Sequence, residues 1–246
     1  MLQFEGRFIS LPTLFADDGV SLSEIRLARL IRWYCNRGVE GFYVCGEIGE
    51  FTALALAERK TVLETVIREA RGVVPVIVNV TSMSTAASMD LAQNAANHGA
   101  KAVVVSPPYH GILTQEEIVN QLKSVGSFSK IPSIIVDPAK KVLETSKLEL
   151  ADIRSSVFAD SSIAIDEFRA GGVSVARVDA LGKTEITVAE TAELFRSIHP
   201  AKVVKACLDL QNLDIGPPRL PLRRMQGEAL EHLKMRLEPS STRLAS

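Results

Sequence analysis

Short apolar runs rich in β-branched residues recur along the first part of the chain, separated by longer stretches of mixed polarity. The clearest runs lie at residues 42–45, 75–80, 101–106 and 131–137, with a first strand expected within residues 7–15. Continuous apolar runs are typical of parallel strands covered on both faces. The stretches between them have apolar residues at helical spacing, which predicts helices at about residues 22–35, 54–70, 82–98 and 115–125.

Strand and helix thus alternate without a linker, and this alternation predicts a parallel sheet, either doubly wound or closed into a barrel. No G-x-G-x-x-G motif follows the first strand, which argues against a dinucleotide-binding sheet. We therefore predict the α/β class with a TIM-type (β/α)8 barrel.

The alternation shortens after Pro138. We predict a weak strand at residues 156–160 and a clear one at 173–178, and helices at 143–154, 163–170, 187–198, 201–213 and 227–237. About seven strands are recognisable where a complete barrel has eight. We expect an incomplete barrel domain at residues 1–200, with C-terminal helices at 201–246 packed on it.

Two helix starts carry the capping-box pattern of a hydroxyl residue followed three positions later by glutamate. Ser21 with Glu24 predicts the start of the first helix, and Thr114 with Glu117 that of the fourth.

The turn after the second strand is the centre of this arrangement. Gly46 and Gly49 lie in it, between a buried strand and a helix, at the strand end where barrels place their sites. Glu47, Glu50 and Asp137 each follow a strand and could together hold a divalent cation for aldol chemistry. Alternatively, Glu50 hydrogen-bonds to its own turn and Asp137 caps a strand end.

Composition excludes several classes of function. The chain has 28 basic and 29 acidic residues, and no long basic run that would suit nucleic acid. No apolar stretch reaches transmembrane length and the N-terminus lacks a signal-peptide pattern, so we expect a cytoplasmic protein without membrane contact. Three cysteines and four histidines are too scattered for a disulfide framework or a zinc site, and we expect no cofactor.

Four motifs in order resemble the signatures of one family. The turn Gly46-Glu-Ile-Gly-Glu50 resembles G-T-T-G-E, and the run Ser106-Pro-Pro-Tyr109 resembles T-P-Y-Y. The run Ala170-Gly-Gly-Val173-Ser-Val resembles A-G-G-x-G-V-I-S-V. The last motif, P-V-K-A … G-P-x-R-x-P-L, is matched by Val204-Lys-Ala206 with Gly216-Pro-Pro-Arg-Leu-Pro221. The chain is thus similar to the dihydrodipicolinate synthase and N-acetylneuraminate lyase family of (β/α)8 barrels. The resemblance implies a homodimer or homotetramer and a small 2-oxo acid, such as pyruvate, as ligand.

Members of that family form a Schiff base between pyruvate and a lysine on strand six. A strand-five tyrosine transfers protons, hydroxyls of the G-T-T-G-E turn hold the carboxylate, and a strand-four tyrosine completes the relay, commonly across a subunit interface. Of these groups the resemblance retains only the strand-four tyrosine, as Tyr109.

The other positions are changed. Glu47 and Ile48 replace the turn hydroxyls, and neither suits a bound carboxylate, because isoleucine cannot hydrogen-bond and glutamate repels it. Val136 stands where the strand-five tyrosine is expected. For strand six two alignments remain open. Either Ala159 occupies the position of the lysine, or residues 158–162 match the end of strand seven and the lysine segment is deleted.

We therefore expect a shortened family member, with a second loss between residues 195 and 201, that is non-catalytic or repurposed to bind a small organic acid or a partner. The alternative is an active pyruvate-dependent aldolase that uses Lys140, Lys141 or a divalent metal. Lys205, in a late helix, is a poor substitute nucleophile, whereas His110 could act as an acid or base. The candidate catalytic residues are Tyr109, Lys140 and Lys141, and the candidate substrate-binding residues are Gly46, Glu47, Ile48, Gly49, Glu50, Val136, Asp137 and Ala159.

Overall fold

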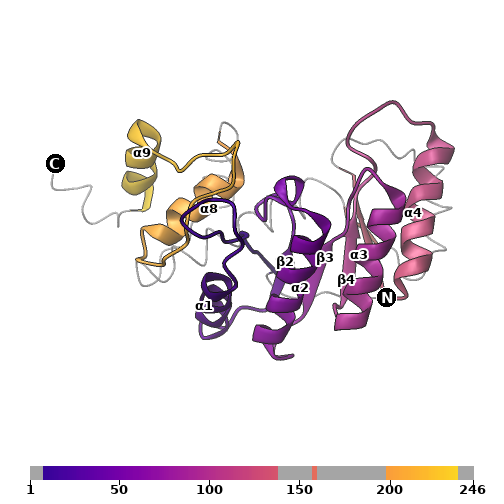
Figure 1. The fold of residues 1–246 in the computed structure, drawn as a ribbon, viewed down its shortest axis with the longest axis horizontal. Coiled ribbons are helices and arrows are strands. Elements are labelled where there is room, and N and C mark those ends of the chain that lie inside the picture. The colour runs from indigo at the N-terminus through magenta and orange to yellow at the C-terminus, as the bar shows by residue number, and fades with distance from the viewer. Residues whose placement is uncertain (1–7, 138–156, 160–197, 238–246) are drawn as a thin grey trace.

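The computed structural model describes residues 8–137, 157–159 and 198–237 (Figure 1). The strands are β1 (Phe8–Ser10), β2 (Gly41–Val44), β3 (Val76–Asn79), β4 (Ala102–Val105), β5 (Ser133–Val136) and β6 (Val157–Ala159). The helices are α1 (Glu24–Cys35), α2 (Leu56–Ala70), α3 (Thr85–His98), α4 (Gln115–Ser129), α8 (Pro200–Asp209) and α9 (Gly227–Leu237), with a 3₁₀ turn, η1 (Phe51–Ala53), before α2.

The six strands form one parallel sheet whose spatial order, β1 to β6, follows the sequence. Each connection from β1 to β5 passes through a helix, as in a (β/α)8 barrel. The described part of the chain therefore has six of the eight strands of a barrel, which confirms the predicted fold class. The strand predicted at residues 173–178 and the helices predicted at 143–154 and 163–170 lie outside the described residues, as does the helix predicted at 187–198 except for its last residue.

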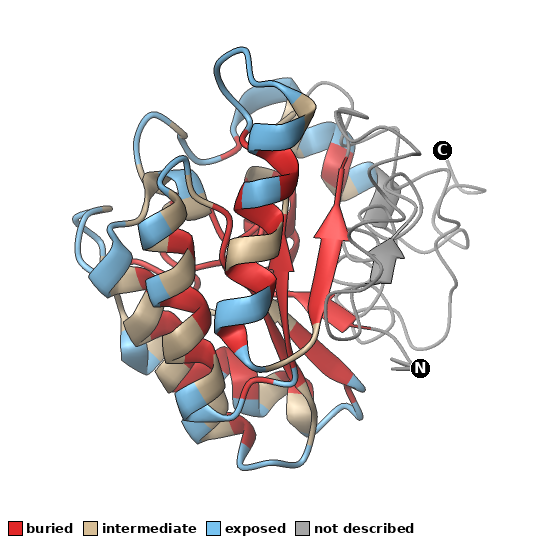
Figure 2. Cartoon of the chain, turned by 90° about the vertical axis from the view of Figure 1, so that its right-hand side faces the viewer, coloured by how far each residue is buried: buried red, intermediate tan, exposed pale blue. Residues whose placement is uncertain are grey.

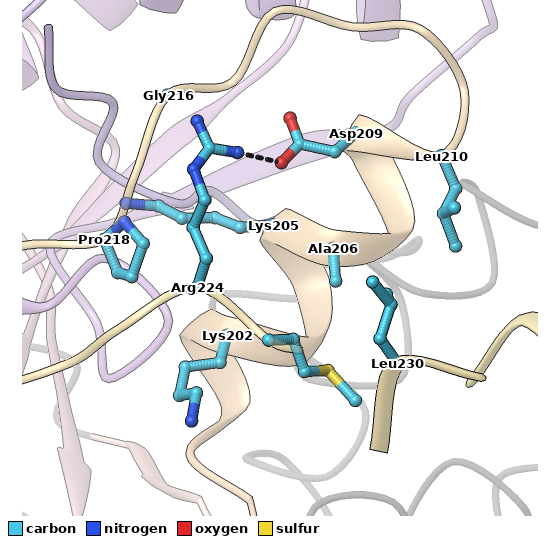
Figure 3. Close-up of a pocket in the computed structure, with 10 residues that line it drawn as sticks. Lys202, Lys205, Ala206, Asp209, Leu210, Gly216, Pro218, Arg224 and Leu230 are labelled. Atoms are coloured by element: carbon cyan, nitrogen blue, oxygen red, sulfur yellow. Dashed lines mark hydrogen bonds and ion pairs between the residues drawn. The ribbon is translucent and has the colours of Figure 1, made fainter. Parts of the chain in front are cut away.

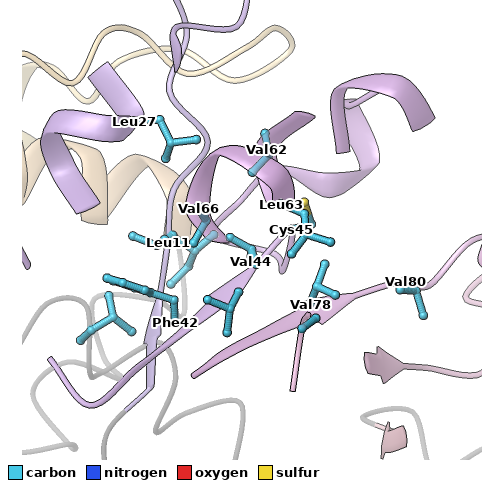
Figure 4. Close-up of a cluster of buried hydrophobic side chains, with 14 of the residues drawn as sticks. Leu11, Leu27, Phe42, Val44, Cys45, Val62, Leu63, Val66, Val78 and Val80 are labelled. Atoms are coloured by element: carbon cyan, nitrogen blue, oxygen red, sulfur yellow. The ribbon is translucent and has the colours of Figure 1, made fainter. Parts of the chain in front are cut away.

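The strands bury both faces, which explains their continuous apolar sequences. Toward the helices, Phe42, Val44 and Val78 pack against Val62 and Val66 of α2 (Figure 4). Figure 2 shows the helices over this face, with their buried residues toward the strands and their exposed residues outward.

The opposite face of the sheet has a smaller apolar cluster. Its members are the alternate residues of the strands, Phe8, Ile77, Ala102, Val104, Ile134 and Val136, with Tyr43 packed against them. The period of two places these residues on the inner side of the barrel arc.

The two predicted helix starts have different outcomes. Thr114 and Glu117 form the capping box at α4, as predicted. The prediction for α1 is wrong, because the N-cap is Ser23, whose Oγ accepts the N–H of Arg26. The Oγ of Ser21 instead donates to a carboxylate oxygen of Asp18, at 2.7 Å. Either serine suits a cap, and this loop contact decides between them.

The C-terminal helices lie at the β1 end of the molecule. Figure 1 shows α8 beside α1 and the loop that follows β1, on the opposite side from α4. Helix α8 begins at Pro200, with His199 as its N-cap, and ends at Asp209, four residues before the predicted end at Leu213. Within the described residues no helix is both long and apolar enough to cross a membrane.

Candidate functional site

The turn after β2 is compact and backbone-lined. Cys45 and Glu50 both adopt left-handed backbone angles, with φ of +55°. A Cβ on Gly46 would lie 2.5 Å from the ring of Tyr43, and one on Gly49 would lie 3.1 Å from the Cα of Cys45. Close packing therefore favours glycine at both positions.

Glu50, at the end of this turn, forms a buried ion pair with Lys205 of α8. The Nζ of Lys205 lies 2.5 Å from the Oε1 of Glu50, and the two side chains are 3% and 1% exposed. The other oxygen of Glu50 accepts the backbone N–H of Arg219 at 2.8 Å. Glu50 does hydrogen-bond within its own turn, through its backbone N–H to the carbonyl of Glu47 at 3.0 Å. Its carboxylate holds the C-terminal segment.

Lys205 has a further partner in the carbonyl of Pro217, at 3.2 Å, and its Nζ lies 4.7 Å from the ring centroid of Phe15. Burial lowers the pKa of Lys205, while the neighbouring Glu50 opposes that shift. The carboxylate in direct contact favours the ammonium form of the lysine, which is not nucleophilic.

Arg219 completes this attachment. Its guanidinium donates to both carboxylate oxygens of Glu58, at 2.7 and 2.8 Å, to the carbonyl of Ala53 at 2.9 Å and to the carbonyl of Val20. It also lies 4.3 Å above the ring of Phe15. The segment after α8 thus ties the loop after β1 to the start of α2.

A second polar network joins the carboxyl ends of β2, β3 and β4. The amide of Asn79 donates to the carbonyl of Cys45 at 2.8 Å and accepts from the hydroxyl of Thr81 at 2.6 Å. The Thr81 hydroxyl accepts the backbone N–H of Ser106 at 2.9 Å. The amide of Asn79 and the hydroxyl of Thr81 are both hydrogen-bonded, so this network fixes the strand ends.

Arg59 of α2 lies beneath this network. Its guanidinium donates to the carbonyls of Asn79 and Thr81 at 2.6 and 2.8 Å, and no described carboxylate pairs with it. Arg59 is only 4% exposed, and this burial lowers the pKa of its guanidinium. Phe51 lies between Arg59 and Tyr109, 5.4 Å from the guanidinium carbon and in edge-to-face contact with the Tyr109 ring at 6.1 Å. Within the part of the chain that the structure describes, the partners of the Arg59 guanidinium are therefore backbone carbonyls and not carboxylates.

The predicted substrate-binding residues that the structure describes lie in different environments. Glu47 is exposed at the turn, whereas Ile48 is 1% exposed and belongs to the outer apolar core. Tyr109 is 52% exposed. Val136 lies in the inner cluster, and Asp137 follows it in a buried position.

The register of the sheet brings two of the changed positions together. Val136 of β5 and Ala159 of β6 are direct Cα partners. The pairing is compatible with both alignments of residues 157–159, as strand six or as the end of strand seven, because either strand could follow β5 in the sheet. Lys140 and Lys141 lie outside the described residues.

The proposed metal site is not formed. Among the described residues, no group of three or more histidine, cysteine, aspartate or glutamate side chains could hold a metal ion. Glu50 faces Lys205, which physically removes it from any set with Glu47 and Asp137. The sequence analysis did not predict that Lys205 pairs with Glu50 or that Arg219 pairs with Glu58. The signal that could have found them is their place in the two late motifs, at residues 204–206 and 216–221.

The parallel strand order β1 to β6 and the glycine turn at the end of β2 define the class of protein as a (β/α)8 barrel. Comparison with known proteins defines the family. The model of the dihydrodipicolinate synthetase family matches residues 3–145. The chain belongs to this family.

Named relatives agree with this assignment. A 4-hydroxy-tetrahydrodipicolinate synthase of Rhizobium meliloti is 36% identical over 151 residues, which cover 61% of this chain and 51% of that protein. The chain spans about half the length of this and similar relatives. A synthase of the same name from a Thermoanaerobacter species aligns over 283 positions at 25% identity, covering 94% of this chain and 95% of that protein. Since this chain has only 246 residues, the longer alignment contains gaps opposite it.

Solved structures show the same fold. A catalytic lysine mutant of Ruminococcus gnavus sialic acid aldolase matches with a TM-score of 0.76 at 20% identity, over 95% of this chain and 94% of that one. Dihydrodipicolinate synthase from Aquifex aeolicus also gives 0.76, at 21% identity, over 95% and 97% of the two chains.

Proposed function

We propose that this family member has lost the Schiff-base lysine and serves in binding instead of carbon–carbon lyase chemistry. One observation carries the proposal. Val136 and Ala159, partners in the register, are the residues expected at the positions of the strand-five tyrosine and the strand-six lysine. Neither residue type can form an imine with a keto acid or transfer a proton.

The proposed ligand at the mouth is a small organic acid, for which the 2-oxo acid pyruvate is the first probe. Arg59 supports this choice, because a buried cation without a carboxylate partner among the described residues attracts an anion. Glu47 and Ile48 supply no hydroxyl to the acid. We therefore expect weak binding without turnover.

The loop between β4 and α4 supports association with another chain. Three of its side chains are exposed and apolar in large part: Tyr109, Leu113 and Ile112, the last fully exposed at 103%. Clustered apolar groups of this kind mark interaction surfaces. We propose that this loop contributes to a homodimer or homotetramer, and that residues 1–200 form the barrel unit on which residues 201–246 pack.

Calorimetry with pyruvate, followed by measurement of pyruvate consumption with and without an aldehyde, tests the proposal. We expect saturable binding and no consumption. Glu47→Gln removes a negative charge from the mouth and is expected to strengthen binding by several-fold, in line with about 1 kcal/mol for an exposed charge. Catalytic consumption would contradict the non-catalytic role, and absence of binding would contradict the choice of ligand.

A further inference from the structure

A cavity of about 230 Å³ lies between α8, the segment that follows it and α9 (Figure 3). Lys202, Ala206 and Asp209 form one wall, since residues three and four apart share a helix face. Arg224 and Leu230 come from the facing segment and helix. This cavity is separate from the turn after β2.

The walls are fixed by contacts that do not depend on a ligand. An ion pair between Arg224 and Asp209, at 2.6 Å, joins the facing segment to α8. Gly216 holds the start of that segment against the chain, because a Cβ there would lie 2.3 Å from the carbonyl oxygen of Phe15. The short side chain of Ala206 leaves the space between the walls open (Figure 3).

Among the described residues, the charges around the cavity leave one cation, Lys202, without an ion-pair partner. Lys205 lines the cavity with its stem, but its ammonium is paired with Glu50. Arg224 is paired with Asp209. The ammonium of Lys202 has no ion-pair partner among the described residues. The site therefore matches a ligand with a single negative charge.

The rest of the lining is apolar. Ala206 and Leu230 present aliphatic surface (Figure 3), and Met225 also lines the cavity. A volume of about 230 Å³ corresponds to roughly eight groups of the size of water, at about 30 Å³ each. A six-carbon monocarboxylate has this number of non-hydrogen atoms.

We infer that this cavity binds a small aliphatic monocarboxylate, with the carboxylate at Lys202 and the chain along Ala206, Met225 and Leu230. The inference is independent of the function proposed for the barrel mouth, because the two sites share no ligand-binding group.

Calorimetric titration of the whole chain with acetate, butyrate, hexanoate and octanoate tests the inference. We expect affinity to rise by about fourfold per added methylene up to hexanoate, because each buried methylene contributes about 0.8 kcal/mol, and then to stop rising as the space is filled. Hexan-1-ol, which lacks the charge, is expected to bind at least about tenfold more weakly.

Variants at three positions locate the site. Lys202→Met is expected to weaken hexanoate binding by about tenfold or more, whereas Lys202→Arg retains it. Ala206→Leu fills the cavity and is expected to abolish binding while the variant keeps its thermal unfolding transition. Asp209→Asn removes the ion-pair partner of Arg224 and is expected to tighten hexanoate binding. A cationic ligand would instead bind more weakly to this variant.

The outcomes are decisive. No binding of hexanoate at about 10 mM overturns the inference, as does equal binding by Lys202→Met or by Ala206→Leu. A mouth variant, Glu47→Gln, is expected to leave hexanoate binding unchanged. If Glu47→Gln alone altered it, hexanoate would occupy the mouth, and the cavity would not be its site.

Discussion

Replacing Lys205 by methionine is expected to lower the free energy of unfolding by about 3–5 kcal/mol. The substitution keeps most of the buried stem but leaves the carboxylate of Glu50, whose side chain is 1% exposed, without its counter-ion. An uncompensated charge at that depth is strongly destabilising. Urea unfolding followed by circular dichroism measures the loss, read as a shift of the midpoint at constant slope.

Two control variants separate the causes of that loss. Lys60→Met removes an ion pair of similar length with Asp90, at 2.7 Å, but both side chains are substantially exposed, and we expect a loss of at most about 1 kcal/mol. The double variant Glu50→Gln with Lys205→Met removes both charges and is expected to recover part of the stability. A loss below about 1 kcal/mol in Lys205→Met would show that Glu50 does not depend on the lysine.

Replacing Gly216 by alanine is expected to cost about 2–4 kcal/mol, from a left-handed backbone and a steric clash together. Its φ is +74°, and the added Cβ would lie 2.3 Å from the carbonyl oxygen of Phe15. That oxygen already accepts a hydrogen bond from Arg26 at 2.7 Å, so it cannot readily move. The same unfolding experiment measures the effect.

Gly72→Ala is the matched control for this prediction. Gly72 has nearly the same φ, +70°, but nothing lies within 4 Å of its ideal Cβ. We expect a loss of about 1 kcal/mol from the backbone angle alone. Equal losses at the two positions would mean that the segment after α8 does not pack against the loop after β1 as the structure shows.

The strands and most helices could be predicted because their signals are local. Apolar runs such as 75–80 and 101–106 identify buried strands within a few residues, and the capping box at Thr114 identifies the start of α4. The start of α1 could not be predicted, because Ser21 and Ser23 are equally good caps until a contact from Asp18 distinguishes them.

The candidate site was predicted only as far as its position. The sequence places the turn, Tyr109 and Val136 at strand ends, and the structure keeps them there. The ion pair of Glu50 with Lys205 could not be predicted, because the residues lie 155 positions apart and neither carries a local sign of its partner. The burial of Arg59 could not be predicted either, because its partners are carbonyls at the carboxyl end of β3 and not groups of its own helix.

The claim that the chain does not use a Schiff base is tested most directly by borohydride reduction in the presence of pyruvate, read by intact mass. A family member that has the strand-six lysine, treated in parallel, shows that the conditions trap an imine. The account predicts no adduct on this chain. A stable reduced adduct on one lysine would contradict it, and its disappearance in the variant with Lys140→Arg and Lys141→Arg would identify the substitute nucleophile.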